Sequence, residues 1–264
     1  MLELNSICKT FNPGTINAKT ALNSLSLSIK EGDFVTVIGG NGAGKSTMLN
    51  AVAGVFEVDS GTIKIDGADV TRLSEHKRAV FLGRVFQDPM MGTAPTMSIE
   101  ENLALALRRG QKRGLKWGIT NDERELYREK LATLGLGLET RLSDKVGLLS
   151  GGQRQALTLL MASLKAPKLL LLDEHTAALD PKTAAKVLEL SDEIVSASNL
   201  TTMMVTHNMR DAIAHGNRLI MLDAGRVVVD VAGEEKKRLT VTDLLDLFSK
   251  ASGSSEANDA MLLG

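Results

Sequence analysis

Three short segments of the chain carry residue types that suit phosphate and metal chemistry. The first, GGNGAGKST at residues 39–47, has the spacing G-x-x-x-x-G-K-[ST]. Glycines in such a segment let backbone amides close around phosphates, and the start of the following helix adds a positive dipole. Lys45 would then reach the β- and γ-phosphates, and Ser46 would ligate magnesium. A plain glycine turn before a helix needs neither residue, so the segment predicts a phosphate-binding loop.

The second segment, LLLLDEHTAALDP at residues 169–181, runs four leucines into an acid pair. An apolar strand that ends in an acid is how nucleoside triphosphatases hold magnesium, which assigns Asp173 to the metal. Glu174 follows in the turn, where it would polarise an attacking water. An acid pair by itself is more often a solvated turn, but the phosphate loop in the same chain favours the catalytic interpretation. One metal cluster of residues 173–175 is not expected, because adjacent side chains at a strand end cannot all point the same way.

The third segment, LLSGGQRQALTLL at residues 148–160, begins with a helix start signal. Ser150 and Gln153 form a capping-box pattern ahead of apolar residues at helical spacing. A helix start does not explain Gly151 and Gly152, which each cost about 1 kcal/mol relative to alanine inside a helix. Close approach of another group to the backbone would explain them, and a second phosphate at this helix N-terminus is a sufficient reason.

The elements that must position these segments follow from the hydrophobic pattern. Four short apolar runs predict strands, and helical patterns fall between them, which favours an α/β sandwich with a mainly parallel sheet covered on both faces. Polar residues follow each run directly, and the carboxyl ends of parallel strands meet at one sheet edge. The loop at residues 39–47, Gln87, the acid pair and His207 should therefore converge. The four runs are residues 34–38, a segment ending at 85–86, residues 169–172 and residues 203–206.

Other segments indicate additions to this sandwich. Near-alternating apolar residues at 22–29 and in GTIKIDGADV (61–70) predict a small antiparallel edge sheet. Residues from about 90 to 165 predict an inserted helical lobe, in which Ser98 and Glu101 form a capping box. A hairpin turn is expected at Ala224-Gly225. The main domain should span residues 1–250, and the polar stretch 251–264 is expected to be disordered.

Composition excludes several classes of protein. The formal net charge of the 264 residues is -1 and charged residues make up 24%, so no overall charge attracts nucleic acid or acidic lipid. A single cysteine, Cys8, cannot form an internal disulfide. The N-terminus lacks a signal-peptide pattern, and no apolar run of 18 residues occurs. We expect a chain that is neither secreted nor membrane-spanning by itself.

Taken together, the motifs and their order resemble those of the nucleotide-binding subunit of an ATP-binding cassette (ABC) transporter. The resemblance covers roughly residues 1–230. It identifies GGNGAGKST as the Walker A loop, LSGGQ (149–153) as the signature motif and LLLLDE as the Walker B strand. It also identifies Gln87 as the Q-loop glutamine, residues 178–180 as the D-loop and His207 as the switch histidine.

The resemblance implies a set of site residues. Glu174 would be the general base, assisted by His207, Gln87 and Lys45, and magnesium would be held by Ser46, Gln87 and Asp173. Phe11 would stack on adenine, with a core or edge aromatic as the alternative. The residues implied to contact ATP are Phe11, Gly39, Asn41, Gly42, Ala43, Gly44, Lys45, Ser46, Thr47, Ser150, Gly151, Gly152, Gln153 and Asp180.

The resemblance also implies partners. In this family two subunits pack head to tail, so that the signature of one touches the γ-phosphate held by the other, and we expect a homodimer or a pair with a similar subunit. A separate transmembrane permease, docked near Gln87, would place the chain on the cytoplasmic side of the plasma membrane, and an extracellular binding protein would deliver the solute. The DEHTAALDP variant resembles ATPases assigned to amino acids such as tryptophan or tyrosine. Alternatives are an exporter ATPase and a soluble ATPase of iron-sulfur assembly; nucleic acid is not an expected partner.

Two features stay open at this level. His175 stands where most of the family has proline, so we expect a residue of the turn, with a hydrogen bond to Glu174 as the alternative. The basic segment 108–117 contains Arg108, Arg109 and Trp117, and is either a solvated loop or a face toward anionic lipid or the permease.

Overall fold

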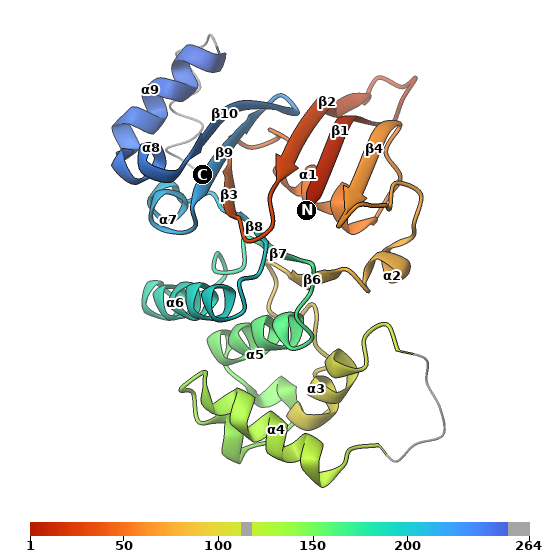
Figure 1. The fold of residues 1–264 in the computed structure, drawn as a ribbon, viewed down its shortest axis with the longest axis vertical. Coiled ribbons are helices and arrows are strands. Elements are labelled where there is room, and N and C mark those ends of the chain that lie inside the picture. The colour runs from red at the N-terminus through yellow and green to blue at the C-terminus, as the bar shows by residue number, and fades with distance from the viewer. Residues whose placement is uncertain (112–117, 253–264) are drawn as a thin grey trace.

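The central element of the computed structural model, which describes residues 1–111 and 118–252, is a six-stranded sheet with the order β10-β9-β3-β8-β7-β6 (Figure 1). All neighbouring strands pair in parallel except β9 and β10, which form an antiparallel hairpin. The strands are β3 (Phe34–Ile38), β6 (Leu82–Val85), β7 (Leu169–Asp173), β8 (Thr202–Val205), β9 (Arg218–Asp223) and β10 (Arg226–Ala232). The mainly parallel α/β sandwich predicted from the sequence is confirmed.

The run of four leucines is explained by burial of β7 on both faces. Leu169 and Leu171 belong to the core that lies against α1 (Lys45–Ala53), whereas Leu170 and Leu172 belong to the core shared with the helical lobe. All four side chains are fully buried. A strand covered on both sides has no solvent-facing position, so its sequence is continuously apolar.

A second sheet of four antiparallel strands, with the order β2-β1-β4-β5, lies at one side of the first (Figure 1). It confirms the predicted antiparallel edge. Strand β1 was not predicted from the sequence: its inward residues Leu2, Leu4 and Ile7 alternate with polar residues only at its start. The strands are β1 (Leu2–Phe11), β2 (Lys19–Ile29), β4 (Ser60–Ile65) and β5 (Ala68–Asp69).

The chain between β6 and β7 forms the helical lobe below the main sheet in Figure 1. The capping boxes of Ser98 with Glu101 and of Ser150 with Gln153 are both present. The lobe contains α3 (Ile99–Leu107), α4 (Asn121–Ala132), α5 (Gly151–Ser163) and the 3-10 turns η1 (Leu138–Thr140) and η2 (Val146–Leu148). The remaining helices are α2 (Glu75–Arg78), α6 (Pro181–Ala197), α7 (Met209–Ala214), α8 (Gly233–Arg238) and α9 (Val241–Ser252).

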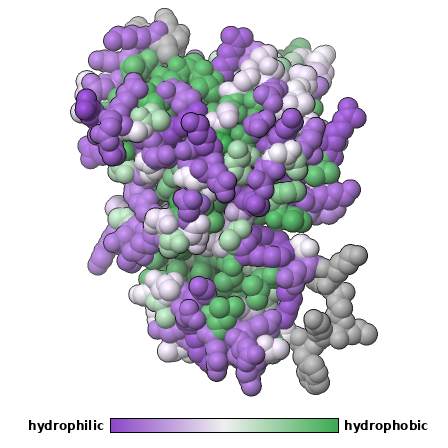
Figure 2. Space-filling view, in the orientation of Figure 1, coloured by the Kyte–Doolittle hydropathy of each residue, from purple (hydrophilic) through white to green (hydrophobic). Residues whose placement is uncertain are grey.

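Hydrophilic residues cover most of the face in Figure 2, and hydrophobic residues gather over the lobe near α4 and α5. Within residues 1–111 and 118–252, every helix is too short or too polar to cross a membrane.

Several predicted boundaries differ from the structure. Thr206 and Phe86 lie just outside strands. Helix α9 continues through Ser252, two residues into the stretch that was expected to be disordered, and residues 253–264 lie outside the described part. The hairpin turn is as expected, with positive φ values of 45° at Ala224 and 74° at Gly225.

Candidate active site

The loop after β3 forms a cavity of 280 Å³ at the carboxyl edge of the sheet. Residues 41–47 line it together with Glu174 and Phe11. Gly44 has a φ of 103°, and a Cβ there would lie 2.5 Å from the Ala21 carbonyl oxygen. This position therefore requires glycine, which lets the loop close against β2 before α1 begins.

The ammonium group of Lys45 lies back over the loop. Its Nζ donates to the carbonyl oxygens of Gly39 at 2.6 Å and of Gly40 at 3.2 Å. Burial lowers the pKa of Lys45, an effect that nearby Glu174 opposes. A partly desolvated cation bound only to carbonyls is suited to attract an anion entering the cavity.

Asp173, at the end of β7, is paired with an arginine that sequence reasoning missed. Arg84 of β6 lies 3.3 Å from Asp173 Oδ2, donates to Asn50 Oδ1 at 2.6 Å and stacks over the Phe86 ring at 4.5 Å. Burial raises the pKa of Asp173, and Arg84 opposes this shift. Arg84 carried no sequence signal, because its role depends on β6 and β7 being neighbours in the sheet.

The oxygen donors near the loop are suited to magnesium. The Ser46 hydroxyl and the Glu174 carboxylate line the same cavity, and Asp173 precedes Glu174. Among the residues that the structure describes, no three His, Cys, Asp or Glu side chains gather as a metal cage. Magnesium typically needs no such cage, because phosphates and waters complete its octahedral shell beside one or two carboxylates.

Glu174 and His207 contact each other at the ends of β7 and β8. Glu174 Oε2 lies 3.5 Å from His207 Nδ1, and the Glu174 amide donates to the Val205 carbonyl at 2.9 Å. The φ of Glu174 is 42°, a left-handed conformation that is unfavourable for a residue with a Cβ. The structure thus brings together the predicted base and the predicted switch histidine at the edge of the loop cavity.

The signature residues occupy a different cavity. Ser150, Gly152 and Gln153 line a space of 340 Å³ next to α6, and none of its lining residues lines the loop cavity. A Cβ on Gly152 would lie 2.1 Å from Thr183 Cγ2 of α6. Close helix packing within the chain is therefore one reason for Gly152, in addition to the phosphate contact inferred from the sequence. A Cβ on Gly151 would lie 3.4 Å from Leu179 Cδ2, which is an ordinary van der Waals contact.

The other predicted residues lie around these two cavities. Gln87 is exposed after β6 and does not line the loop cavity. Asp180 caps α6 by accepting the Thr183 amide at 3.1 Å. Phe11 makes an edge-to-face contact with Phe56 at 5.4 Å between ring centres while its side chain lines the loop cavity. Lys19, also on the cavity wall, was missed because no motif marks it.

His175 lies in the turn, as expected, but it is buried there and does not bond to Glu174. It is 2% exposed, and its Nε2 lies 3.0 Å from Ser191 Oγ of α6 rather than against Glu174. Burial lowers the pKa of His175 to about 4, so the imidazole is neutral near pH 7. Of the basic segment, Arg108 donates to Glu123 within the lobe at 2.9 Å, and residues 112–117 lie outside the described part.

A phosphate-binding type of loop follows β3, and the acid pair follows β7, which is separated from β3 by the single strand β8. This arrangement defines a P-loop nucleoside triphosphatase. A family model described as ABC transporter matches residues 22–177. The chain belongs to this family and is an ABC-type ATPase.

Similar proteins agree with this assignment. The chain is 47% identical over 251 residues to a tyrosine transport ATP-binding protein of Clostridioides difficile, covering 95% of this chain and 100% of the relative. It is 35% identical to the spermidine/putrescine import ATP-binding protein PotA of Haemophilus influenzae, covering 89% of this chain and 59% of that longer protein. A solved dimeric ATP-binding cassette in a post-hydrolysis state with ADP and Pi superposes with a TM-score of 0.74 at 32% identity, covering 88% and 98% of the two chains.

Proposed function

We propose that two copies of this chain, or one copy and a similar subunit, pack head to tail around two magnesium-ATP molecules and drive a separate permease. The observation that carries the proposal is the separation of the two motif cavities. The loop cavity contains Lys45 and Glu174, whereas Ser150 and Gly152 line another cavity that shares no residue with it. A γ-phosphate held by one chain can therefore be covered by the signature of a second chain.

In this assembly each site residue has a distinct role. Residues 39–47 bind the phosphates, Lys45 neutralises their charge and Phe11 stacks on the base. Glu174 accepts a proton from the attacking water, and His207 contacts the γ-phosphate beside it. Gln87 connects the site to the permease, and Asp180 reaches the partner chain.

Ser46, Asp173 and Gln87 would hold the magnesium ion. Bound there, the ion would supply positive charge to the β- and γ-phosphate oxygens. Asp173, whose pKa burial raises, would gain a partner that favours its ionised form.

The solute that fits the comparisons best is an aromatic amino acid. A relative that is 47% identical and matched over its own full length is named for tyrosine transport. We therefore propose import, with the permease docked near Gln87, a binding protein outside and this chain at the cytoplasmic side of the plasma membrane.

The experiment that tests dimerisation uses Glu174→Gln, which should bind ATP and nearly abolish turnover. With ATP at micromolar protein, light scattering should give twice the monomer mass of 28.2 kDa. Glu189→Gln, the same change at an exposed position of α6, should hydrolyse ATP normally and show no trapped dimer. A Glu174→Gln chain that stayed monomeric with ATP would contradict the head-to-tail assembly, and retained turnover would remove Glu174 from the role of base.

The membrane partner can be tested by capturing the Glu174→Gln chain from its native membrane in detergent with ATP. Mass spectrometry should identify a permease and a binding protein, and proteoliposomes of that assembly should take up tyrosine or tryptophan. Co-purification with soluble scaffold proteins instead would favour iron-sulfur assembly, and efflux would favour an exporter.

A further inference from the structure

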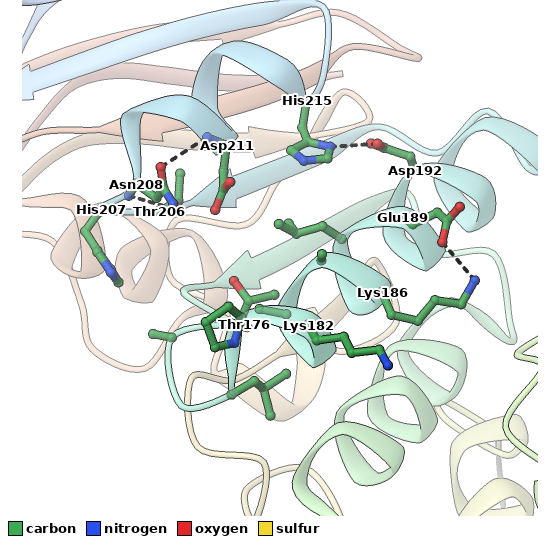
Figure 3. A pocket seen from close by; sticks show the side chains of 16 residues that line it. Thr176, Lys182, Lys186, Glu189, Asp192, Thr206, His207, Asn208, Asp211 and His215 are labelled. Carbon is green, nitrogen blue, oxygen red and sulfur yellow. Dashed lines mark hydrogen bonds and ion pairs between the residues drawn. The ribbon is translucent and has the colours of Figure 1, made fainter. Parts of the chain in front are cut away.

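A cavity of 890 Å³ lies between α6 and the segment that carries His207 (Figure 3). Residues 206–208 and α7 form one wall, and α6 forms the other. Helices separated by such a cavity cannot fix one another by side-chain packing. Each helix is held by other elements, α6 by α5 and α7 by β3, and the contacts that cross the gap or lie at its ends add the direct links between the two sides.

Two consecutive residues of α6 make such contacts. Ser191 Oγ donates to the Val187 carbonyl at 2.8 Å and lies 3.0 Å from His175 Nε2. Because a hydroxyl has one proton and Val187 takes it, His175 Nε2 donates and Ser191 accepts. The next residue, Asp192, accepts from His215 Nδ1 at 2.6 Å, the contact drawn across the cavity in Figure 3.

The first contact holds the residue next to the predicted base. His175 is buried and directly follows Glu174, whose left-handed backbone is pinned on its other side by the Val205 carbonyl. A strained residue of this kind keeps its conformation only where its surroundings hold it on both sides.

The second contact holds the helix that follows His207. Asn208 caps α7 by accepting the Arg210 amide at 2.9 Å, and His215 is the C-cap residue directly after the helix. Across residues 1–111 and 118–252, the His215–Asp192 contact is the one hydrogen bond between α6 and residues 206–215. Adjacent residues of one helix thus reach the segments that carry both members of the Glu174–His207 contact.

We propose that Ser191 and Asp192 are positioning residues that set the separation of Glu174 and His207 through His175 and His215. The inference rests on the proposed roles of Glu174 and His207. It assigns to α6 a part in catalysis that no sequence motif marks, and explains why a histidine follows the acid pair.

The test is a double-mutant cycle on ATP turnover. Ser191→Ala should lower kcat about tenfold, the order of loss expected when a reacting group is displaced by a fraction of an ångström, and leave the KM for ATP within about twofold. In the Glu174→Gln background, followed by single-turnover hydrolysis of labelled ATP over hours, Ser191→Ala should cause no further loss. A merely structural role would lower both backgrounds alike.

The matched control is Ser196→Ala, because Ser196 makes the same kind of bond on the same helix, to the Asp192 carbonyl at 2.6 Å, without reaching another segment. It should leave kcat unchanged. In parallel, Asp192→Ala should lower kcat in the wild-type chain and have no effect in a His207→Ala chain, with Glu189→Ala as its control.

The outcomes distinguish failure of the positioning role from failure of the proposed role of Glu174. Equal losses from Ser191→Ala in both backgrounds, or no loss in either, would overturn the positioning role while leaving the proposed function intact. Wild-type turnover in Glu174→Gln itself would instead remove Glu174 from the proposed role of base, on which the positioning role depends.

Discussion

Gly152→Ala measures whether the signature glycine is required by the fold of one chain or by a second chain. The added Cβ would lie 2.1 Å from Thr183 Cγ2, where ordinary contact begins near 3.4 Å. Relief of that overlap should cost about 1–3 kcal/mol of stability, whereas replacing a helical glycine with alanine returns about 1 kcal/mol. The net destabilisation of the monomer should therefore be between about 0 and 2 kcal/mol.

The second change, Thr183→Ala, removes the methyl group that the new Cβ meets. Urea unfolding of the double variant should show that the overlap is relieved, with stability at or above that of Thr183→Ala alone. In Thr183→Ala, Asp180 keeps its bond from the residue 183 backbone amide but loses the Thr183 hydroxyl, and comparison with Thr183→Ala alone cancels that loss. Light scattering in the Glu174→Gln background then gives the functional result. The double variant should still fail to dimerise with ATP, because in the proposed dimer the alanine would also face the partner's phosphate. Restored dimerisation would show that Gly152 serves only packing on α6, and would refute a phosphate contact at this glycine.

Two further predictions concern buried cations. Arg78, 1% exposed, donates to four carbonyl oxygens, two of them at the end of α1, so Arg78→Met should cost about 3 kcal/mol or more in urea unfolding. Lys77, on the same short helix, is exposed, so Lys77→Met should change stability by about 0.5 kcal/mol at most. Equal effects of the two substitutions would mean that the hydrogen bonds of Arg78 contribute nothing to stability. Burial lowers the pKa of Lys236 to about 8 from 10.5, so the unfolded chain binds more protons between these values and stability should rise with pH there. Between pH 8 and 10.5, the free energy of unfolding of the wild-type protein should rise by up to about 3 kcal/mol relative to that of Lys236→Met. Parallel curves of unfolding free energy against pH for the two proteins would contradict the pKa shift.

Those parts of the fold that sequence reasoning predicted are the ones encoded by local pattern. The leucines of β7 show a strand buried on both faces, and Ser98 and Ser150 begin the helices they cap. The loop is specified by the order of glycines and lysine within residues 39–47, so it can be recognised from that one segment.

Residues that act across the sheet could not be predicted in this way. Arg84 meets Asp173 only because β6 and β7 are neighbours, and His175 meets Ser191 only because α6 folds back over the strand end. The turn at His175 was predicted correctly, but its burial was not, because neither its neighbours nor its spacing indicates a buried partner 16 residues away. Strand β1 was missed for a related reason: bulges break its alternation after Leu4.

The strand order has a consequence for how this chain could be rebuilt. Strands β6 and β7 are adjacent and in parallel register, so the whole segment from Phe86 to Lys168 is topologically a single connection between neighbours. A chimaera that exchanged this connection for that of another cassette would keep every strand pair. It would have to match two close approaches: the Ala162 carbonyl against Gly83, where a Cβ would be 2.4 Å away, and Gly152 against α6. The lobe is thus replaceable in topology, and its compatibility depends on these small residues and on the core that it shares with β7 and α6.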